Sequence, residues 1–127
     1  MNVVDSSAWM SYFAGDRNST HFAQPIQTID DLLVPSIALT EVFKSIFRQR
    51  GEEPALAAIA HMQQGRVIPL DADLAIEAAT VGIEFGLPLA DGIIYATTRR
   101  FNATLWTQDA DFKDLESVRF YAKSQPT

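Results

Sequence analysis

Four acidic residues from distant parts of the chain could together bind a metal cation: Asp5, Glu41, Asp91 and Asp109. Carboxylate oxygens are the ligands that Mg²⁺ and Mn²⁺ prefer in proteins. Carboxylates gathered in one pocket also repel one another, which raises their pKa values until a cation neutralises them. Sequence spacing alone does not bring the four together, so the interpretation depends on where each one lies in the expected fold.

Two of these acids follow apolar segments that read as buried strands. Asp5 comes directly after Val3-Val4, and Asp109 follows the segment 104–106. Ligands of parallel α/β sheets bind outside the carboxyl ends of the strands, where both acids would lie. A charge directly after a buried strand needs a partner or a function. Asp5 could equally cap the helix that begins there, and both interpretations stay open.

The other two acids lie on expected helices. Asp91 belongs to the first turn of a helix over 88–100, where the helix dipole favours a carboxylate. Glu41 lies near the start of a helix over 37–50, on the side opposite its apolar stripe. Exposed acids on helices are also common without any function, so periodicity leaves a solvated role open for both.

Short apolar strands alternate with helices along the whole chain. Strands are expected at 3–4, 32–34, 67–70, 104–106 and 118–120, and helices at 6–15, 20–31, 37–50, 54–65, 71–85 and 88–100. This alternation predicts an α/β fold, a three-layer α/β/α sandwich with a short central parallel sheet of four to five strands.

Composition narrows the class of protein. We expect one domain over 1–127, since 127 residues with 47% apolar content suit a single core. The chain has no cysteine, which excludes thiolate metal sites and disulfides. A net charge of −6 argues against a broad basic face for nucleic acid, although a bound cation can reverse the field inside an acidic pocket. No secretory signal or membrane span is recognised, so we expect a cytoplasmic protein without membrane contact.

Four segments together resemble the ordered motifs of PIN-domain nucleases, and most of all the VapC-type toxins of toxin–antitoxin pairs. The segments are Val3-Val4-Asp5-Ser6-Ser7-Ala8-Trp9, Thr40-Glu41-Val42, Leu89-Ala90-Asp91 and Leu105-Trp106-Thr107-Gln108-Asp109-Ala110-Asp111-Phe112. Each motif is weak alone, but their order, spacing and expected secondary structure match, and the resemblance covers nearly the whole chain.

This resemblance implies a PIN-like fold and an endoribonuclease that depends on one or two Mg²⁺ or Mn²⁺ ions. Metal-activated water would hydrolyse an RNA phosphodiester bond and leave a 3′-hydroxyl and a 5′-phosphate. Transferred motif by motif, the catalytic and metal-binding acids would be Asp5, Glu41, Asp91 and Asp109. Ser6 and Thr107 would be the supporting hydroxyls that orient a ligand.

Two positions depart from the family pattern or fit it ambiguously. Gly92 stands where alanine is commoner, a change that we expect to loosen that helix turn. Asp109 and Asp111 both fit the last motif. We favour Asp109 as the fourth acid because it is nearer the strand end, with Asp111 in a supporting or capping role.

Three arginines are candidates for binding the phosphates of a substrate. Arg48 shares the Glu41 face of its helix, while Arg99 and Arg100 end the helix of Asp91. Arginine near a helix C-terminus is also favourable as a cap, so this role is open for each.

The resemblance also implies partners: an RNA substrate, a small cognate antitoxin protein and a second copy of the chain in a homodimer. An arginine of the antitoxin entering the acidic pocket would be one means of inhibition.

Two alternative functions remain. One is a receiver-type signalling domain, in which Asp71 is phosphorylated, Asp5 belongs to the acid pocket, Thr107 is the switch hydroxyl and Lys123 the basic partner. Receivers usually carry adjacent acids after the first strand, whereas Ser6 follows Asp5 here. The other alternative is a catalytically silent PIN-like module that only binds RNA or protein.

Overall fold

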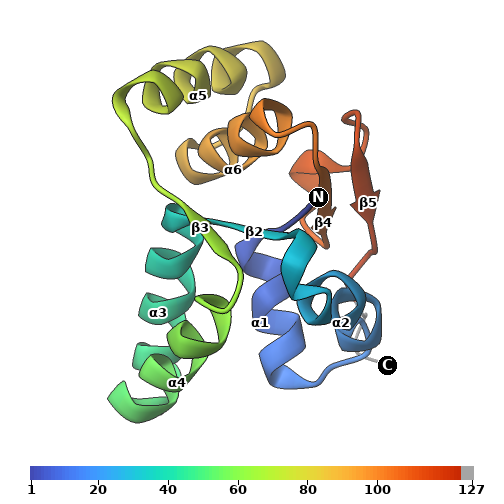
Figure 1. Ribbon diagram of the computed structural model, residues 1–127. Coiled ribbons are helices and arrows are strands. Elements are labelled where there is room, and N and C mark those ends of the chain that lie inside the picture. Colours follow the sequence, from blue (N-terminus) through green and yellow to red (C-terminus); the bar gives the residue numbers. More distant parts are fainter. Residues whose placement is uncertain (124–127) are drawn as a thin grey trace.

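Five short strands form one parallel sheet, in the order β3-β2-β1-β4-β5. The computed structural model describes residues 1–123 (Figure 1). The strands are β1 (Asn2–Val4), β2 (Leu32–Pro35), β3 (Arg66–Ile68), β4 (Thr104–Thr107) and β5 (Val118–Phe120). The helices are α1 (Ser6–Ala14), α2 (Ser19–Gln27), α3 (Ser36–Arg50), α4 (Glu52–Met62), α5 (Ala72–Phe85) and α6 (Leu89–Arg100), with 3₁₀ turns η1 (Ile29–Asp31) and η2 (Ala110–Phe112).

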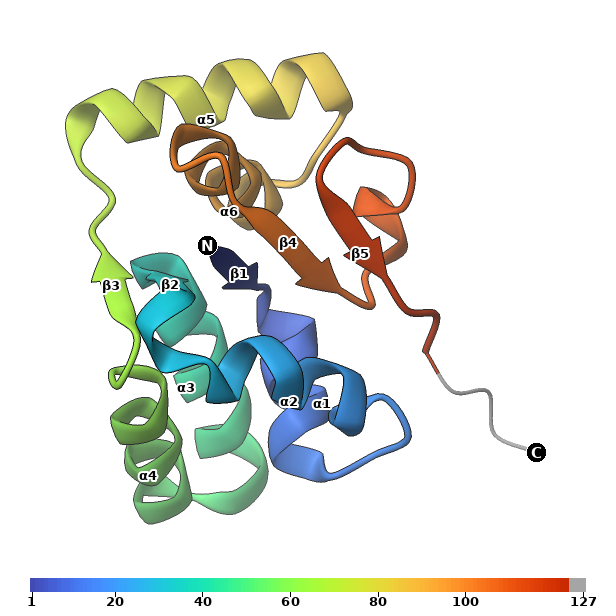
Figure 2. The ribbon, with the colours of Figure 1, turned by 45° about the vertical axis from the view of Figure 1, so that its right-hand side comes forward.

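The helices cover both faces of the sheet. Figure 2 shows α5 and α6 on one face and α1 to α4 on the other. Successive strand residues point to opposite faces, so Val4 packs with the α1–α4 layer while Val3 packs with α5 and α6. Each layer thereby has its own core, and the predicted three-layer α/β/α sandwich with a parallel sheet is confirmed.

The strand order brings the elements of the acidic motifs to one edge of the sheet. β1 lies between β2 and β4, so the residues after β1 and after β4 are neighbours. α3 follows β2 at this same carboxyl edge. α6 leads back to the start of β4, so its first turn also lies at the carboxyl edge. The segments of Asp5, Glu41, Asp91 and Asp109 therefore converge there.

The same order contradicts the receiver alternative. Receiver-type folds have the order 2-1-3-4-5, which places their third strand next to the first. Here β3 is an edge strand, separated from β1 by β2. Asp71, which follows β3, is exposed and caps α5 by accepting a hydrogen bond from the backbone N–H of Leu74 at 2.8 Å.

The second helix is shorter than predicted. We expected it to continue to residue 31, but α2 ends at Gln27. The Thr28 hydroxyl donates to the backbone oxygen of Gln24 at 2.8 Å, and the following residues form η1 instead. Thr28 itself has left the helical region, with φ −91° and ψ 69°, and is the residue at which the helix ends.

Within the described part of the chain, no single helix is long and apolar enough to cross a membrane. α5 and α6 meet the length and composition criteria only as a pair, and the pair is bent by 108°.

Candidate metal centre and active site

Asp5 is buried at the point where β1 becomes α1, with 2% of its surface exposed. One carboxylate oxygen accepts the backbone N–H of Ala8 at 2.9 Å, which makes Asp5 the N-cap of α1. The Ser7 hydroxyl donates to the same oxygen at 2.8 Å, and the Thr107 hydroxyl donates to the other at 2.7 Å. The two interpretations of Asp5 are therefore compatible, since a helix cap also lies at the ligand edge of the sheet.

The surroundings of Asp5 weaken its acidity. Burial raises its pKa from 3.8 to about 6, because the charged form loses hydration. Hydrogen bonds from Thr107, Ala8 and Ser7 oppose this shift, while the nearby carboxylate of Asp109 adds to it. A buried carboxylate with several donors is held in one orientation, which suits a metal ligand.

Asp91, Asp109 and Asp111 form the acid group of this site. One carboxylate oxygen from each lies within 4.8 Å of the oxygens of the other two, so a single cation can contact all three. Asp91 comes from the first turn of α6, and the other two come from the turn that follows β4. An all-oxygen set of this kind fits the hard cations Mg²⁺ and Mn²⁺.

Asp91 has a strongly raised pKa. Its pKa rises from 3.8 to about 8, first because it is desolvated and then because Asp109 lies beside it. Asp5 and Asp111 add further repulsion. The carboxylates of Asp5, Asp91, Asp109 and Asp111 repel one another. A divalent cation bound among them would offset this repulsion and favour the deprotonated form of Asp91.

The turn after β4 is built by its own polar groups. The hydroxyl of Thr107 accepts the backbone N–H of Asp109 at 2.9 Å while it donates to Asp5. The carboxylate of Asp109 accepts the backbone N–H of Asp111 at 2.9 Å and so caps η2. Asp109 is half-buried and Asp111 exposed, yet both belong to the acid group.

Glu41 is not one of the acid group and contacts the segment of Asp5 instead. The Ser6 hydroxyl donates to its carboxylate at 2.6 Å, across 35 residues of sequence. Glu41 is half-buried on α3, on the same face as Ser45 and Arg48, as the helical periodicity predicts. Ser6 follows Asp5 directly, so this bond ties Glu41 to the segment that carries the buried acid.

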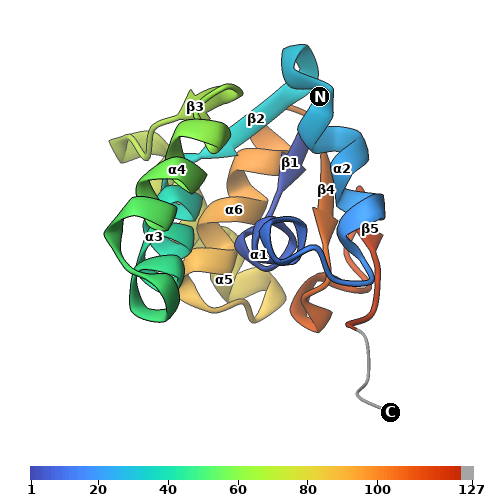
Figure 3. The same ribbon diagram turned by 90° about the horizontal axis from the view of Figure 1, so that it is seen from below.

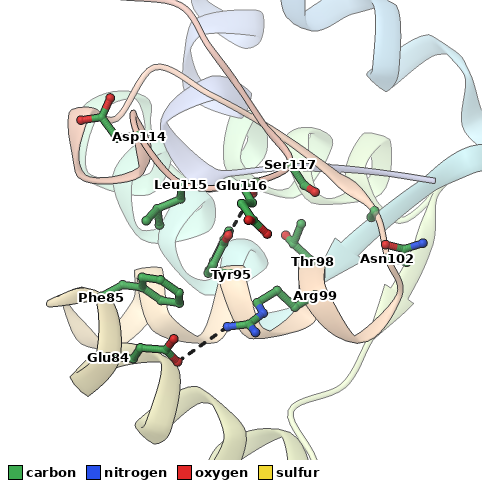
Figure 4. A pocket seen from close by; sticks show the side chains of 11 residues that line it. Glu84, Phe85, Tyr95, Thr98, Arg99, Asn102, Asp114, Leu115, Glu116 and Ser117 are labelled. Carbon is green, nitrogen blue, oxygen red and sulfur yellow. Dashed lines mark hydrogen bonds and ion pairs between the residues drawn. The ribbon is translucent and has the colours of Figure 1, made fainter.

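The candidate arginines lie in two different places. Arg48 shares a hollow with Glu41. Arg99 and Arg100 are at the other end of α6 from Asp91 and turn toward α5. Arg99 pairs with Glu84 at 3.8 Å beside a cavity of about 440 Å³ (Figure 4).

Arg100 is also held in ion pairs. It contacts Glu77 at 3.1 Å and Asp71 at 3.5 Å. The hydrogen bond from the Leu74 N–H, and then Arg100, lower the pKa of Asp71. The structure thus does not bring Arg99 or Arg100 to the acid group. Their contacts are those of residues that fasten α6 to α5.

Comparison with known proteins identifies the family. The family model of the PIN domain matches residues 3–118. The chain belongs to the PIN domain family. A sequence search of curated proteins finds no significant match.

Solved structures share the fold of this PIN domain over nearly its whole length. A toxin–antitoxin complex from Klebsiella pneumoniae has a TM-score of 0.80 at 21% identity, over 97% of this chain and 100% of that one. VapC20 of Mycobacterium tuberculosis, described as a toxin that cleaves the sarcin–ricin loop, has a TM-score of 0.77 at 22% identity, over 93% of this chain and 97% of that one. VapBC2 from Rickettsia felis, bound to promoter DNA, has a TM-score of 0.72 at 13% identity, over 95% of this chain and 97% of that one.

One polar network of this PIN domain was not predicted from sequence. Asn18 is buried, and its side-chain amide donates to Gln108 at 3.0 Å and to the backbone oxygen of Ala122 at 2.9 Å. Gln108 in turn donates to the backbone oxygen of Ser7 at 3.2 Å. The network fastens the turn beside Asp109 to the start of α1. Asn18 and Gln108 are 90 residues apart, so no local pattern could have revealed it.

Gly92 has a packing role that differs from our expectation. A Cβ at this position would lie 3.0 Å from the backbone oxygen of Ala78 in α5. Glycine therefore permits a close approach of α5 and α6 rather than loosening the helix turn.

Proposed function

We propose that this PIN domain is a metal-dependent endoribonuclease that acts as the toxin of a toxin–antitoxin pair. The observation that carries the proposal is the acid group Asp91, Asp109 and Asp111 beside the buried Asp5, with the pKa of Asp91 raised to about 8 by desolvation and by its acidic neighbours. Such repulsion is costly in a folded protein unless a cation offsets it.

The residues fit a hard divalent cation, Mg²⁺ or Mn²⁺, as one or two ions. Asp91 and Asp109 are the proposed direct ligands. Asp5 lies close enough to act on both, and Glu41 is linked to the Asp5 segment through Ser6. A divalent cation, when bound, lowers the pKa of a water molecule and neutralises charge on a phosphate. The residues already supply an all-oxygen set, and the chain has no cysteine that would favour a softer metal.

The chain's hydroxyl groups have positioning roles in this proposal. Thr107 holds the Asp5 carboxylate and the backbone of Asp109 at once, so it sets the relation between two acids. Ser6 does the same for Glu41. Asp111 completes the acid group from its exposed side. In the reaction, water adds to phosphorus and the bond to the 3′-oxygen breaks, which yields a 3′-hydroxyl and a 5′-phosphate.

The proposal is tested by incubating purified protein, freed of any partner, with a structured RNA and MnCl₂ or MgCl₂. We expect cleavage that EDTA abolishes and that the variants Asp5→Asn and Asp91→Asn both lose. The control is Asp30→Asn, which removes an exposed acid in η1, before β2 and thus at the opposite edge of the sheet. It should cut like the parent protein.

Clean Mn²⁺ binding without cleavage of any RNA would instead favour the catalytically silent binding module. Cleavage that persists in EDTA, or in Asp91→Asn with its fold intact by circular dichroism, would refute the metal-dependent mechanism.

We further propose a cognate antitoxin and a homodimer as partners, with the cytoplasm as the place where RNA is met. The structural neighbours support the antitoxin, since they include a toxin–antitoxin complex. Exposed apolar side chains on α5 and at the start of α6 support a second copy of the chain, namely Ile76, Ile83 and Leu89. Light scattering on the purified protein, with Ile83→Lys as the variant expected to become monomeric, tests this assembly.

A further inference from the structure

A hollow of about 600 Å³ opens beside the acid group, between α3 and the start of α6. Glu41 and Ala90, which precedes Asp91, lie at its lining, together with Lys44, Ser45 and Arg48. Figure 3 shows α3 beside α6. We propose that this hollow, the α3 groove, guides a single RNA strand to the acids, with Lys44 and Arg48 binding its phosphates. The inference rests on the proposed ribonuclease function and adds the path of the substrate.

The position of the groove connects it directly to the site. Glu41 lies in the groove and is bonded to Ser6, the residue after Asp5. Ala90 brings the first turn of α6, and with it Asp91, to the groove wall. A strand lying along α3 would therefore reach the acids at the Glu41 end of the groove.

The two basic side chains of the groove, Lys44 and Arg48, are spaced along the axis of α3. Lys44 and Arg48 are four residues apart on one face of α3, which separates them by about 6 Å along the helix axis. Arg48 lies about 10 Å along the same axis from Glu41. The two cations thus form a line that leads away from the acids. Ser45 lies between them and offers a hydroxyl to a phosphate or a sugar.

Lys44 and Arg48 are available to an incoming anion. Both are exposed, and neither has an ion pair within residues 1–123. Arg99 and Arg100, by contrast, are held by acids of the α5 layer. Arg50 is on α3 as well, but it lines a different hollow with Met10 and other α1 and α4 residues.

Electrostatics explains why the site needs these two residues. The chain has a net charge of −6, and its acids would repel an RNA backbone that approached without local positive charge. Two cations on one helix do not make the broad basic face that a duplex requires, whereas they suit a single strand in a groove. Thr40, Ser45 and Gln49 add uncharged polar groups to the lining, which suits backbone contacts without base selection.

The test measures binding apart from cleavage. A 5′-fluorescein single-stranded RNA of mixed sequence is titrated with protein in EDTA, by fluorescence anisotropy, at several salt concentrations. For a single strand, each phosphate contact contributes about 0.7 to the slope of log K against log salt. We expect Lys44→Ala and Arg48→Ala each to lower the slope by about 0.7 and the double variant by about 1.4. Lys44→Arg should keep the parent slope.

Arg50→Ala is the matched control, because it removes one positive charge from the same helix but on another hollow. Its slope should equal that of the parent protein. Three outcomes would contradict RNA binding in the α3 groove. They are equal slopes for all variants, a loss of slope in Arg50→Ala as large as in Lys44→Ala, and no RNA binding by the parent protein at low salt.

The outcome is separable from that of the proposed function. If the parent cuts RNA while the slopes stay equal, the groove is wrong and the ribonuclease stands. If the slopes fall as expected but no RNA is cut with Mn²⁺, the groove stands as an RNA site and the enzymatic activity is refuted.

Discussion

The hydroxyl of Thr107 bridges two acids: it donates to Asp5 at 2.7 Å and accepts the backbone N–H of Asp109 at 2.9 Å. Thr107 ends β4, and Asp5 follows the neighbouring strand β1. The bridge is therefore a direct result of strand pairing. Because β1 and β4 pair in a fixed register, the bridge fixes the position of Asp5 relative to Asp109.

Replacing this hydroxyl should destabilise the protein. Thr107→Val leaves a buried carboxylate oxygen and a backbone N–H without their partner, which we expect to cost about 1–3 kcal/mol. Urea unfolding at pH 7 measures the change. Thr80→Val, at an exposed hydroxyl on α5 with only a 3.4 Å contact, is the control and should stay within about 0.5 kcal/mol. Equal losses in both variants would contradict the bridging role of Thr107.

The metal-free protein should lose stability as pH rises from 5 to 8.5. The folded state raises the pKa of Asp5 to about 6 and that of Asp91 to about 8, from 3.8 in the unfolded chain. The folded state therefore binds more protons over this range, and its free energy of unfolding falls as those protons leave. The lowered pKa of Asp71 acts at lower pH and adds nothing to this slope.

The variant Asp91→Asn isolates the contribution of Asp91 to the pH dependence of the free energy of unfolding. Asparagine has no proton to lose, so the variant should show a flatter pH dependence in EDTA and exceed the parent in stability at pH 8.5. Because Asp91 is half-buried, solvent screening limits the gain to on the order of 1 kcal/mol. Urea unfolding at several pH values measures it. A steeper dependence in the variant than in the parent would show that the carboxyls are not in mutual repulsion.

Asp109 and Asp111 should differ in their effect on Mn²⁺ affinity. Asp109 is half-buried between Thr107 and Asp91, whereas Asp111 reaches the acid group from an exposed turn. We expect Asp111→Asn to weaken binding by about 10- to 100-fold, as for a supporting residue, and Asp109→Asn to weaken it more. Titration calorimetry with MnCl₂ measures both.

Asp114→Asn provides the control for these variants, because it removes an exposed acid from the same loop but outside the acid group. Its affinity should match the parent. A larger loss in Asp111→Asn than in Asp109→Asn would reverse the assignment of the fourth acid.

Gly92→Ala should destabilise the contact between α5 and α6. The added methyl group would lie 3.0 Å from the backbone oxygen of Ala78, and a backbone atom in a helix cannot easily move aside. We expect a loss of about 1–3 kcal/mol in thermal or urea unfolding. Gly82→Ala is the matched control, since its nearest contact would be an ordinary 3.5 Å. It should gain stability from the higher helix propensity of alanine.

Much of this fold can be predicted from the sequence because short apolar strands alternate with helices. Every predicted strand is present, and the parallel arrangement follows from the helical crossovers. The order of the strands could not be predicted, because it depends on which apolar faces pack across the sheet. The early end of α2 was missed because no glycine or proline marks residues 27–31 as a helix end.

The site was only partly predictable, for a related reason. Asp5 was recognisable from its place after a strand, and repulsion among the acids was expected. The desolvation that contributes most to both raised pKa values depends on packing and was not predicted. Glu41 could be placed on a helix face but not beside Ser6, because that contact spans 35 residues. Lys44 was not singled out from the sequence, because its place in the α3 groove depends on the approach of α6 to α3.

The central position of β1 has a consequence for how the protein is made. Its partner across the site, the turn with Asp109, is synthesised 104 residues after Asp5, or roughly 5 to 20 seconds later at the pace of a ribosome. A growing chain contains Asp5 early but does not yet contain Thr107 or Asp109, which lie beside it in the folded protein. The acids assemble only when β4 has emerged and added to the sheet, so a nascent copy carries an incomplete site until then.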